Sequence, residues 1–510
     1  MQQYHELRRW VMATMAVALV GCGGGGGDSG ANGSAQPLPA SSSLAERCAT
    51  PRPAGTINPL TGAPYGDQQG SVSDEKAWVR SWIDETYLWY QDVENLSAAV
   101  LDPAAYPTAV SYFNVLKSPL TTATGKPKDR FHFVMDTPSW VAQSRSDIVF
   151  GYGFQIALLK STPPRSTIVV YTIPNSPAAA ANIGRGASIL SVDGIDQIND
   201  GTQAGIDILN AGLFPKVAGT HTFTLMDVGS TTVRSVTLTA GPISETPVQH
   251  VKTLPPPNQT VGYMEFDAHV ATAESLLINA VAQLQAAQIT DLVLDVRYNG
   301  GGLLNIASEL AYMIAGPTAT SGKPFEQLTF NDKNPFHLTA SQTTTPFFRV
   351  SQGFAGTAPQ ALPYLSLQRV FMLVGNGTCS ASEAIINSLR GVGVQVNLIG
   401  STTCGKPYGF RPQDNCNTTY FAIQFQGVNA QGFGDYADGF TPTCQASDDF
   451  SRALGDPSEN VLAAALAMRT SGTCVANSSS NNLALSLGQR QPEMVLVRPA
   501  WRENRIYTDR

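Results

Sequence analysis

The sequence predicts an α/β protein in which a strand–helix core follows a β-rich domain and a small helical region. Three observations support this fold class. From Val261 onward, strands and helices alternate at lengths typical of parallel sheets with helical crossovers. Before them, residues 148–242 contain mostly short strands and turns, and an apolar stripe of helical period begins near Trp78. With 510 residues, 43% hydrophobic and 14% charged, the chain can bury more than one core.

The helical region is expected over residues 73–145, with one helix beginning near Asp74 and a second around Ala105 to Leu116. The β-rich domain is expected over residues 146–246. Its predicted elements are strands 155–159, 167–173, 221–226 and 233–238 and a helix over 202–213. The core is expected over residues 247–470, followed by a tail over 471–510. Its predicted strands are 261–266, 291–296, 369–374 and 395–399, its helices are 272–287, 303–315, 382–389 and 459–468, and a hairpin begins at 418–425.

The first residues have the pattern of a targeting segment. Arg8 and Arg9 precede an apolar run over 10–20, which is too short to span a bilayer and fits the core of a signal peptide. The run ends in Leu-Val-Gly-Cys22, which resembles the lipobox of bacterial lipoproteins. The resemblance implies a signal peptide over 1–21, a lipid on Cys22 and a flexible tether over 22–72. An ordinary secretory signal with a chance cysteine is the alternative.

The lipoprotein pattern implies a bacterial cell-envelope protein anchored in the membrane through Cys22. Gly23 in place of aspartate suits the outer membrane, facing the periplasm. The formal charge of −7 gives no basic surface, which disfavours a nucleic-acid partner. Six cysteines remain after Cys22, and an even number in an exported chain favours disulfides, with 15 possible connectivities. None of them has zinc spacing, so we expect no metal.

Residues 148–242 resemble a PDZ domain. The segment Gly151-Tyr152-Gly153-Phe154 stands where that family has its carboxylate-binding loop, whose backbone N–H groups capture a peptide's terminal carboxylate. A plain glycine-rich turn would explain this segment alone. Segments at 176–178 and 189–194 then follow in the family's order. The resemblance therefore implies a peptide-binding unit.

Three segments of the predicted core carry residues that could do chemistry. Ser380 lies between a buried strand and a helix, where free N–H groups and the helix dipole favour negative charge. Its spacing to Glu383 also fits a simple capping box. Lys406 follows the next strand and can act as a base if burial lowers its pKa from about 10.4 by about three units. Three glycines, Gly300 to Gly302, let backbone approach a ligand closely, or form a tight turn.

Together these segments resemble the tail-specific, carboxy-terminal-processing serine peptidases over roughly residues 74–470. The resemblance implies a crotonase-like α/β core and peptide-bond hydrolysis through an acyl-enzyme without a cofactor. Ser380 would be the nucleophile, preferred over the neighbouring Cys379, and Lys406 the general base. The N–H of Ala381 and one from Gly300 or Gly301 would form the oxyanion hole. The substrates would be polypeptides, cut near C-termini or in unstructured segments.

The sequence departs from this family after the lysine. Many members carry a glutamine four residues later that orients the amine, whereas this chain has Phe410 there and Gln413 further on. Either Gln413 takes the place of this glutamine as the orienting residue, or the lysine is oriented differently, or the activity is weak. Because Cys379 and Cys404 stand beside the two catalytic candidates, we expect them to form a disulfide that fixes both loops, with Cys416–Cys444 as a second pair. The alternative function is a non-catalytic lipoprotein of the same fold that binds peptides or an apolar ligand.

Overall fold

The computed structural model describes residues 37–145, 148–354, 356, 358–474 and 494–497. The predicted signal peptide and Cys22 lie outside these residues. Within the described part of the chain, no helix combines the length and apolar character needed to cross a membrane.

The helical region contains the helix that its apolar stripe predicts, as α2, whereas the second helix, α5, is shorter than the predicted range 105–116, and α3, α4 and α6 were not predicted. Helix α2 begins after Ser71, whose hydroxyl accepts from the Asp74 N–H while Asp74 accepts from the Ser71 N–H, a capping box. Trp78 and Trp82 stack with ring centroids 5.4 Å apart, and both also pack against Tyr420. The helices are α1 (Ser41–Leu44), α2 (Val72–Thr86), α3 (Tyr90–Glu94), α4 (Ala98–Leu101), η1 (Pro103–Ala105), α5 (Ala109–Phe113) and α6 (Thr137–Arg145).

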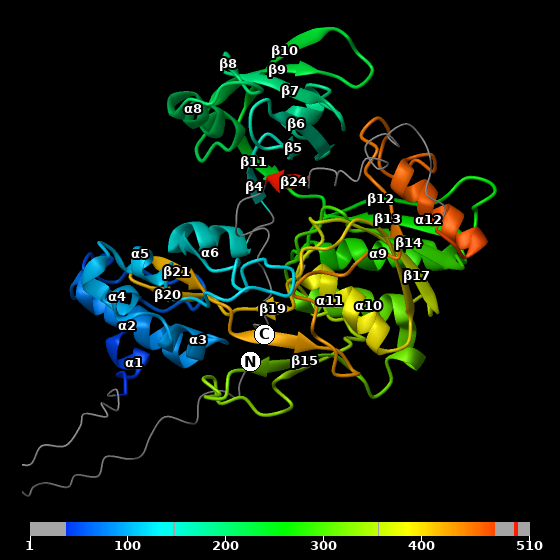
Figure 1. Ribbon diagram of the computed structural model, residues 1–510. Helices are drawn as coiled ribbons and strands as arrows, with labels where there is room; N and C mark the ends of the chain where they lie inside the picture. Colours follow the sequence, from blue (N-terminus) through cyan, green and yellow to red (C-terminus); the bar gives the residue numbers. More distant parts are fainter. Residues whose placement is uncertain (1–36, 146–147, 355, 357, 475–493, 498–510) are drawn as a thin grey trace, which may run out of the picture. The chain divides into compact units, whose positions relative to one another are not determined.

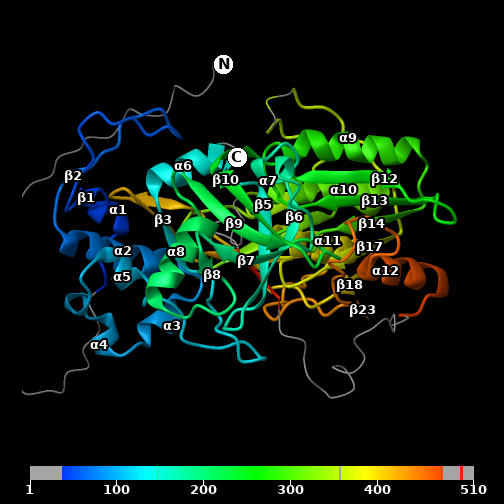
Figure 2. The ribbon, with the colours of Figure 1, turned by 90° about the horizontal axis from the view of Figure 1, so that it is seen from above.

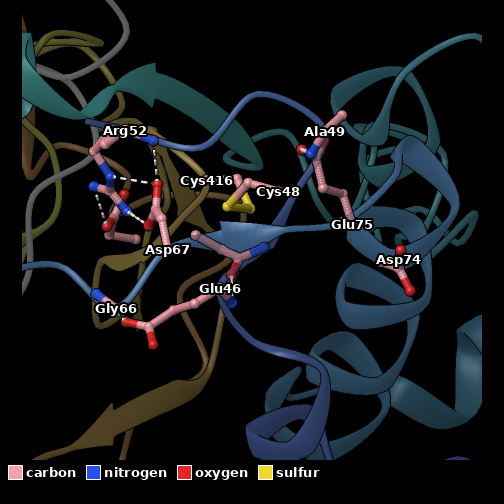
Figure 3. The surroundings of a disulfide bond; sticks show 12 residues. Glu46, Cys48, Ala49, Arg52, Gly66, Asp67, Asp74, Glu75 and Cys416 are labelled. Carbon is pink, nitrogen blue, oxygen red and sulfur yellow. Dashed lines mark hydrogen bonds and ion pairs between the residues drawn. A yellow bond between two sulfur atoms is a disulfide. The ribbon is translucent and has the colours of Figure 1, made fainter. Parts of the chain in front are cut away.

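The expectation of a flexible tether does not hold for the described part of residues 22–72. Strands β1 (Arg47–Cys48) and β2 (Gln68–Gln69) pair there, and Cys48 forms a disulfide with Cys416 (Figure 3). Arg52 forms ion pairs with Asp67 at 2.6 Å and Asp414 at 2.8 Å. A glycine- and proline-rich composition indicated a tether, but these cross-links hold the segment against distant parts of the chain.

The middle unit, residues 148–244, is a β-rich unit with its own core around Val169, Phe223 and Leu225. Its main sheet has the strand order β10-β9-β7-β6-β5-β24, in which β24 (Val495–Val497) comes from the tail (Figure 1). The elements of the unit include the predicted strands and helix, as β5, β6, β9, β10 and α8, together with several that were not predicted. They are β4 (Ile148–Gly151), β5 (Phe154–Lys160), β6 (Ser166–Thr172), α7 (Pro177–Ala180), β7 (Ser188–Val192), β8 (Ile195–Asp196), α8 (Gln203–Leu213), β9 (Thr220–Met226), β10 (Val233–Thr239) and β11 (Gly241–Ser244).

The core is a six-stranded sheet of order β12-β13-β14-β17-β18-β23, in which all neighbours from β13 to β23 are parallel. Helices α9, α10 and α11 pack on one face and α12 on the other (Figure 1), and Figure 2 shows the strands following one another from β12 to β23. The four inner strands, β13, β14, β17 and β18, are buried on both faces along nearly their whole length, as parallel strands covered by helices require, whereas the edge strand β12 is partly exposed. Its elements are β12 (Val248–Thr253), β13 (Val261–Phe266), α9 (Ala273–Ala286), β14 (Asp291–Asp295), α10 (Leu304–Ala319), β17 (Arg369–Val374), α11 (Ala381–Gly391), β18 (Gln395–Gly400), β23 (Cys444–Gln445) and α12 (Asn460–Ser471).

Two small antiparallel sheets replace the hairpin predicted from Thr418. One has the order β20-β21-β3 and the other β16-β15-β22-β19. The predicted hairpin strand therefore divides, because β21 pairs with the N-terminal region while β22 pairs with β15. These strands are β3 (Phe133–Asp136), β15 (Pro324–Phe330), β16 (Thr344–Pro346), β19 (Tyr408–Gly409), β20 (Gln413–Asn415), β21 (Thr418–Phe421) and β22 (Phe425–Val428).

Candidate active site

Ser380 lies on the sharp turn between β17 and α11, and it is completely buried. Its backbone has φ 59° and ψ −117°, a conformation that costs a residue with a Cβ free energy and that clusters at functional sites. A strand-to-helix turn of this kind presents a nucleophile at the N-terminus of a helix. The turn is braced by Thr378, whose hydroxyl donates to the Val296 carbonyl at 2.8 Å.

The glycine loop, residues 299–302, follows β14 and lies directly against this turn. The Cys379 N–H donates to the Asn299 carbonyl at 3.1 Å, and the Ser382 hydroxyl donates to the same oxygen at 3.1 Å. Gly301 has φ +101°, and a Cβ there would come within 2.8 Å of the Ser380 Cβ. Only glycine therefore allows the loop to approach the serine this closely.

The amides of this loop differ in their availability to a substrate. The Gly301 N–H donates to Asn299 Oδ1 at 2.9 Å, so it is already engaged. Among the described residues, neither the Gly300 N–H nor the Ala381 N–H has a hydrogen-bond acceptor. Of the two glycines predicted for the oxyanion hole, Gly300 is therefore the better candidate.

His269 forms hydrogen bonds that hold the glycine loop in place. Its sequence context did not mark it as a functional residue. Its backbone N–H donates to the Gly301 carbonyl at 3.1 Å, and its Nδ1 is 3.0 Å from Asn299 Oδ1. The ring is completely buried, and burial lowers its pKa to about 3, so it is neutral.

Lys406 lies on the loop after β18, and its side chain is completely buried. Its Nζ is 4.4 Å from the ring centroid of Phe410 and 5.0 Å from that of Phe131. Gln413 is exposed, and its amide donates to the Asp414 carbonyl at 3.2 Å. The position of the predicted orienting residue is thus on the surface, and Phe410 lies beside the amine instead.

The carboxylate of Glu383 joins the serine turn to the lysine loop. Oε2 accepts from the N–H groups of Ser380 at 3.0 Å and Lys406 at 2.8 Å. Oε1 accepts from the Thr403 hydroxyl at 2.6 Å and the Gly405 N–H at 2.8 Å. Complete burial raises the pKa of Glu383, and these hydrogen bonds only partly offset that rise. The capping-box spacing indicated the contact with Ser380, but nothing local indicated the contacts with the lysine loop.

Two further contacts hold the lysine loop. Cys379 and Cys404 form the expected disulfide, with their Cα atoms 5.2 Å apart. The guanidinium of Arg130, in the helical region, donates to the carbonyls of Cys404 at 2.6 Å and Gly405 at 3.2 Å. Arg130 was missed because no motif marks it, and its partners lie far along the chain.

The expected Cys416–Cys444 pair is wrong. Cys416 bonds to Cys48, and Cys444 bonds to Cys474. Cys444 lies in β23 of the core sheet. Cys416 lies at the turn between β20 and β21, in a different sheet, and its partner Cys48 belongs to β1.

The segment predicted to bind a peptide carboxylate, residues 151–154, connects β4 to β5. Tyr152 is buried, and its hydroxyl donates to the Gly212 carbonyl of α8 at 2.8 Å. Gly153 has φ +85°, and a Cβ there would meet Ser176 at 2.1 Å. The loop is therefore fixed between α8 and α7.

The middle unit also contacts the segment just before the glycine loop through Arg185, whose Nη1 donates to the Tyr298 hydroxyl at 2.8 Å. Asp448 lies between two cations, Arg185 at 3.3 Å and Arg297. Arg297 continues the network to Asp295 at 2.7 Å and Glu459 at 3.0 Å. Buried charges of both signs therefore connect the middle unit to the segment that leads into the glycine loop.

The family model of peptidase family S41 matches residues 260–443, a range that holds the glycine loop, Ser380 and Lys406. This part of the chain is a peptidase S41 domain. The chain is homologous to carboxyl-terminal-processing proteases: it is 29% identical over 238 residues to one from Picosynechococcus sp. and 25% identical over 256 residues to one from Synechocystis sp.. These matches cover 47% and 50% of this chain, and the chain spans about half the length of these relatives (50% and 52%).

A solved structure from Bacteroides fragilis, assigned to the S41 proteases, has the same fold. The match has a TM-score of 0.57 and 23% identity, and it covers 78% of this chain and 97% of the other. The chain therefore has the S41 peptidase fold, with mixed α/β content and several sheets, which confirms the α/β class that the sequence predicted.

Proposed function

We propose that this protein is an exported serine endopeptidase that hydrolyses peptide bonds near C-termini or in unstructured segments. The observation that carries the proposal is the backbone of Ser380: a buried serine at φ 59°, on a strand-to-helix turn, beside the glycine loop and tied through Glu383 to the lysine loop. Such strain is retained where the geometry serves a reaction. The relatedness of the S41 domain to carboxyl-terminal-processing proteases supports the same reaction class.

In the proposed mechanism, the Ser380 hydroxyl attacks the scissile carbonyl while the Lys406 amine takes its proton. The N–H groups of Ala381 and Gly300 donate to the oxyanion of the tetrahedral intermediate, helped by the dipole at the start of α11. The proton then passes to the leaving amine, which departs, and an acyl-enzyme remains on Ser380. Water hydrolyses this ester with Lys406 again acting as the base.

The middle unit is proposed to be PDZ-like and to bind the substrate strand. Strand β5 and helix α8 line a cavity of ≈ 260 Å³ whose walls include Ile156, Leu158, Leu209 and Leu213. An extended peptide that adds to a sheet edge beside such apolar walls gains backbone hydrogen bonds from the strand and side-chain contacts from the groove.

The cellular location stays a proposal drawn from the first residues: a lipid on Cys22 would anchor the enzyme in the bacterial envelope, at the outer membrane facing the periplasm. Incorporation of a labelled fatty acid into the wild type and not into Cys22→Ser tests this anchor.

Hydrolysis of an unfolded protein tests the mechanism. Ser380→Ala and Lys406→Ala should each lower kcat by at least about a thousandfold, because each removes a group that bonds to or exchanges protons with the substrate. Ser388→Ala, a buried serine on the same helix α11, is the matched control and should retain activity. A serine-reactive phosphonate should label Ser380 in the wild type and in the control.

Equal turnover by the wild type and Ser380→Ala would overturn the serine mechanism. A wild type that binds peptides and cleaves none of them at any pH from neutral to alkaline would instead support the binding protein.

A further inference from the structure

The tail supplies a strand to the middle unit. Strand β24 pairs antiparallel with β5 in the register Val495–Leu158, Leu496–Ala157 and Val497–Ile156 (Figure 1). In the sheet order, β24 is the last strand, so without it β5 would be an open edge. An open edge presents unpaired N–H and C=O groups, which is where extended peptides add to a sheet.

Strand β24 takes the position and direction that a peptide ligand of this groove would take. Its partners Ile156 and Leu158 are themselves walls of the cavity between β5 and α8. Because the pairing is antiparallel, the chain direction of β24 runs toward the start of β5 and so toward the 151–154 loop. Arg498 follows Val497, so this strand brings no terminal carboxylate to the loop.

The same strand contacts the turn that carries Ser380. Leu496 is 6% exposed and shares a hydrophobic cluster with Ala157 of β5 and with Tyr298, the residue before the glycine loop. A Cβ at Gly377, three positions before Ser380, would come within 2.0 Å of Leu496 Cδ1. The Asn376 side-chain amide also donates to the Met494 carbonyl. Strand β24, together with Met494 just before it, therefore contacts both the edge of β5 and the turn that carries Ser380.

We propose that β24 is an internal ligand of the β5 edge, which a substrate peptide must displace before the middle unit can bind it. The proposal rests on the peptide-binding role given to the middle unit under the proposed function. The Cys444–Cys474 disulfide ties the chain to the core 20 positions before Met494. A ligand held by so short a connection competes at an effective concentration on the order of millimolar. Displacement would also remove Leu496 and Met494 from Gly377 and Asn376, so that peptide binding reaches the turn of Ser380.

The internal-ligand proposal is tested by measuring peptide binding to the full-length chain. All proteins in this experiment carry Ser380→Ala, so that the peptide is bound without being cleaved. The probe is a fluorescent synthetic peptide with the sequence of residues 490–500, and the readout is its anisotropy. Leu496→Asp, which puts a charge into an apolar site and releases β24, should tighten the Kd by roughly tenfold or more. Val233→Asp, on the opposite edge strand β10 and 50% exposed, is the matched control and should leave the Kd unchanged.

An unchanged Kd in Leu496→Asp would overturn the proposal. If denaturant unfolding shows that this variant does not fold, Leu496→Ala replaces it, and the Kd should again fall, by a smaller factor.

Cleavage of an unfolded protein, measured in variants that keep Ser380, distinguishes failure of the internal-ligand proposal from failure of the proposed peptidase function. Release of β24 should raise kcat/KM by several-fold in Leu496→Asp relative to the wild type and Val233→Asp. A loss or an unchanged kcat/KM, with active wild type, counts against the internal ligand. If no variant cleaves, the proposed peptidase fails, and the anisotropy experiment still decides whether β24 blocks the edge.

Discussion

Glu383 is the residue on which the relative position of the two catalytic candidates depends most directly. Glu383→Gln replaces one acceptor oxygen by an NH₂ group that would face N–H donors, so it loses hydrogen bonds and adds repulsion in a buried site. Because neither loop should then hold its place, we expect kcat to fall at least about tenfold with KM nearly unchanged, since misplacing reacting groups by about 1 Å costs on this scale or more. Steady-state kinetics on an unfolded protein measures both constants.

The control for this substitution is Glu309→Gln, another buried glutamate, on α10. Burial and the nearby Glu274 raise the pKa of Glu309 to about 9, so it is protonated at neutral pH and glutamine replaces it with little change. Its kcat should stay near the wild-type value. A Glu383→Gln variant that is less stable but keeps its kcat would show that the residue is structural only.

At this scale the sequence placed Ser380, Lys406 and the glycine loop on loops that follow strands of a parallel sheet, whose ends meet at one edge, and the structure has these loops in contact. Their catalytic roles stay predictions. The sequence could not identify Glu383 as the link, because its partners at Thr403, Gly405 and Lys406 lie 20 or more positions away. The prediction for Gln413 assumed that a nearby amide would turn toward the amine. In the structure Gln413 begins strand β20 and points to solvent.

At the scale of elements, the Cys379–Cys404 disulfide joins the turn before α11 to the loop after β18. Closing a loop with a sequence separation of 25 contributes about 3.5 kcal/mol in the chain-entropy model. We expect Cys379→Ser/Cys404→Ser to remain folded with kcat lowered at least tenfold, because the bond holds the neighbours of both Ser380 and Lys406. Activity and denaturant unfolding are measured on the same preparation.

The double variant Cys48→Ser/Cys416→Ser is the control, since that bond closes a loop with a sequence separation of 368. It should lose at least as much stability and keep its kcat. If both double variants lose activity in proportion to their stability, the Cys379–Cys404 bond has no special role in the site.

The disulfides also show which elements the sequence could predict. Cys379–Cys404 was predictable because both cysteines stand beside residues expected to meet. Cys48–Cys416 was not, because it depends on how residues 37–72 fold back on the β20–β21 turn (Figure 3). Composition indicated a tether there, yet the pairing of β1 with β2 and the ion pairs of Arg52 order it.

At the scale of the whole molecule, the alternation of strands and helices predicted the core, and the run of short strands and turns before it predicted a β-rich unit. Contacts between distant segments were not predictable. Trp78 of the helical region packs on Tyr420 of β21, and Leu496 of the tail packs beneath the middle unit. Such contacts depend on how the elements pack against one another. Local periodicity predicts the elements themselves but not their packing.

Stability should depend on pH through carboxyl groups buried in this arrangement, and Glu326 of β15 gives the clearest case. Burial raises its pKa from 4.5 to about 8, and no charged group contributes to the shift. The folded protein therefore keeps a proton that the unfolded chain releases above about 4.5. Stability from this group is complete below about pH 4.5 and is lost as the pH rises toward about 8, by about 1.4 kcal/mol per pH unit at most.

Glu326→Gln keeps the shape and removes the titration, so denaturant midpoints of the two proteins should diverge between pH 5 and pH 8 in favour of the variant. The comparison with the wild type is needed because Glu265 and Glu309, whose pKa values are raised to about 8 and about 9, titrate in the same range. Parallel pH profiles for the two proteins would contradict the prediction.

The mechanism needs an uncharged lysine, so its rate rises toward alkaline pH, whereas these buried carboxyl groups favour the folded state at lower pH. The activity of the wild type should therefore be limited on the alkaline side by loss of structure, and Glu326→Gln should extend it.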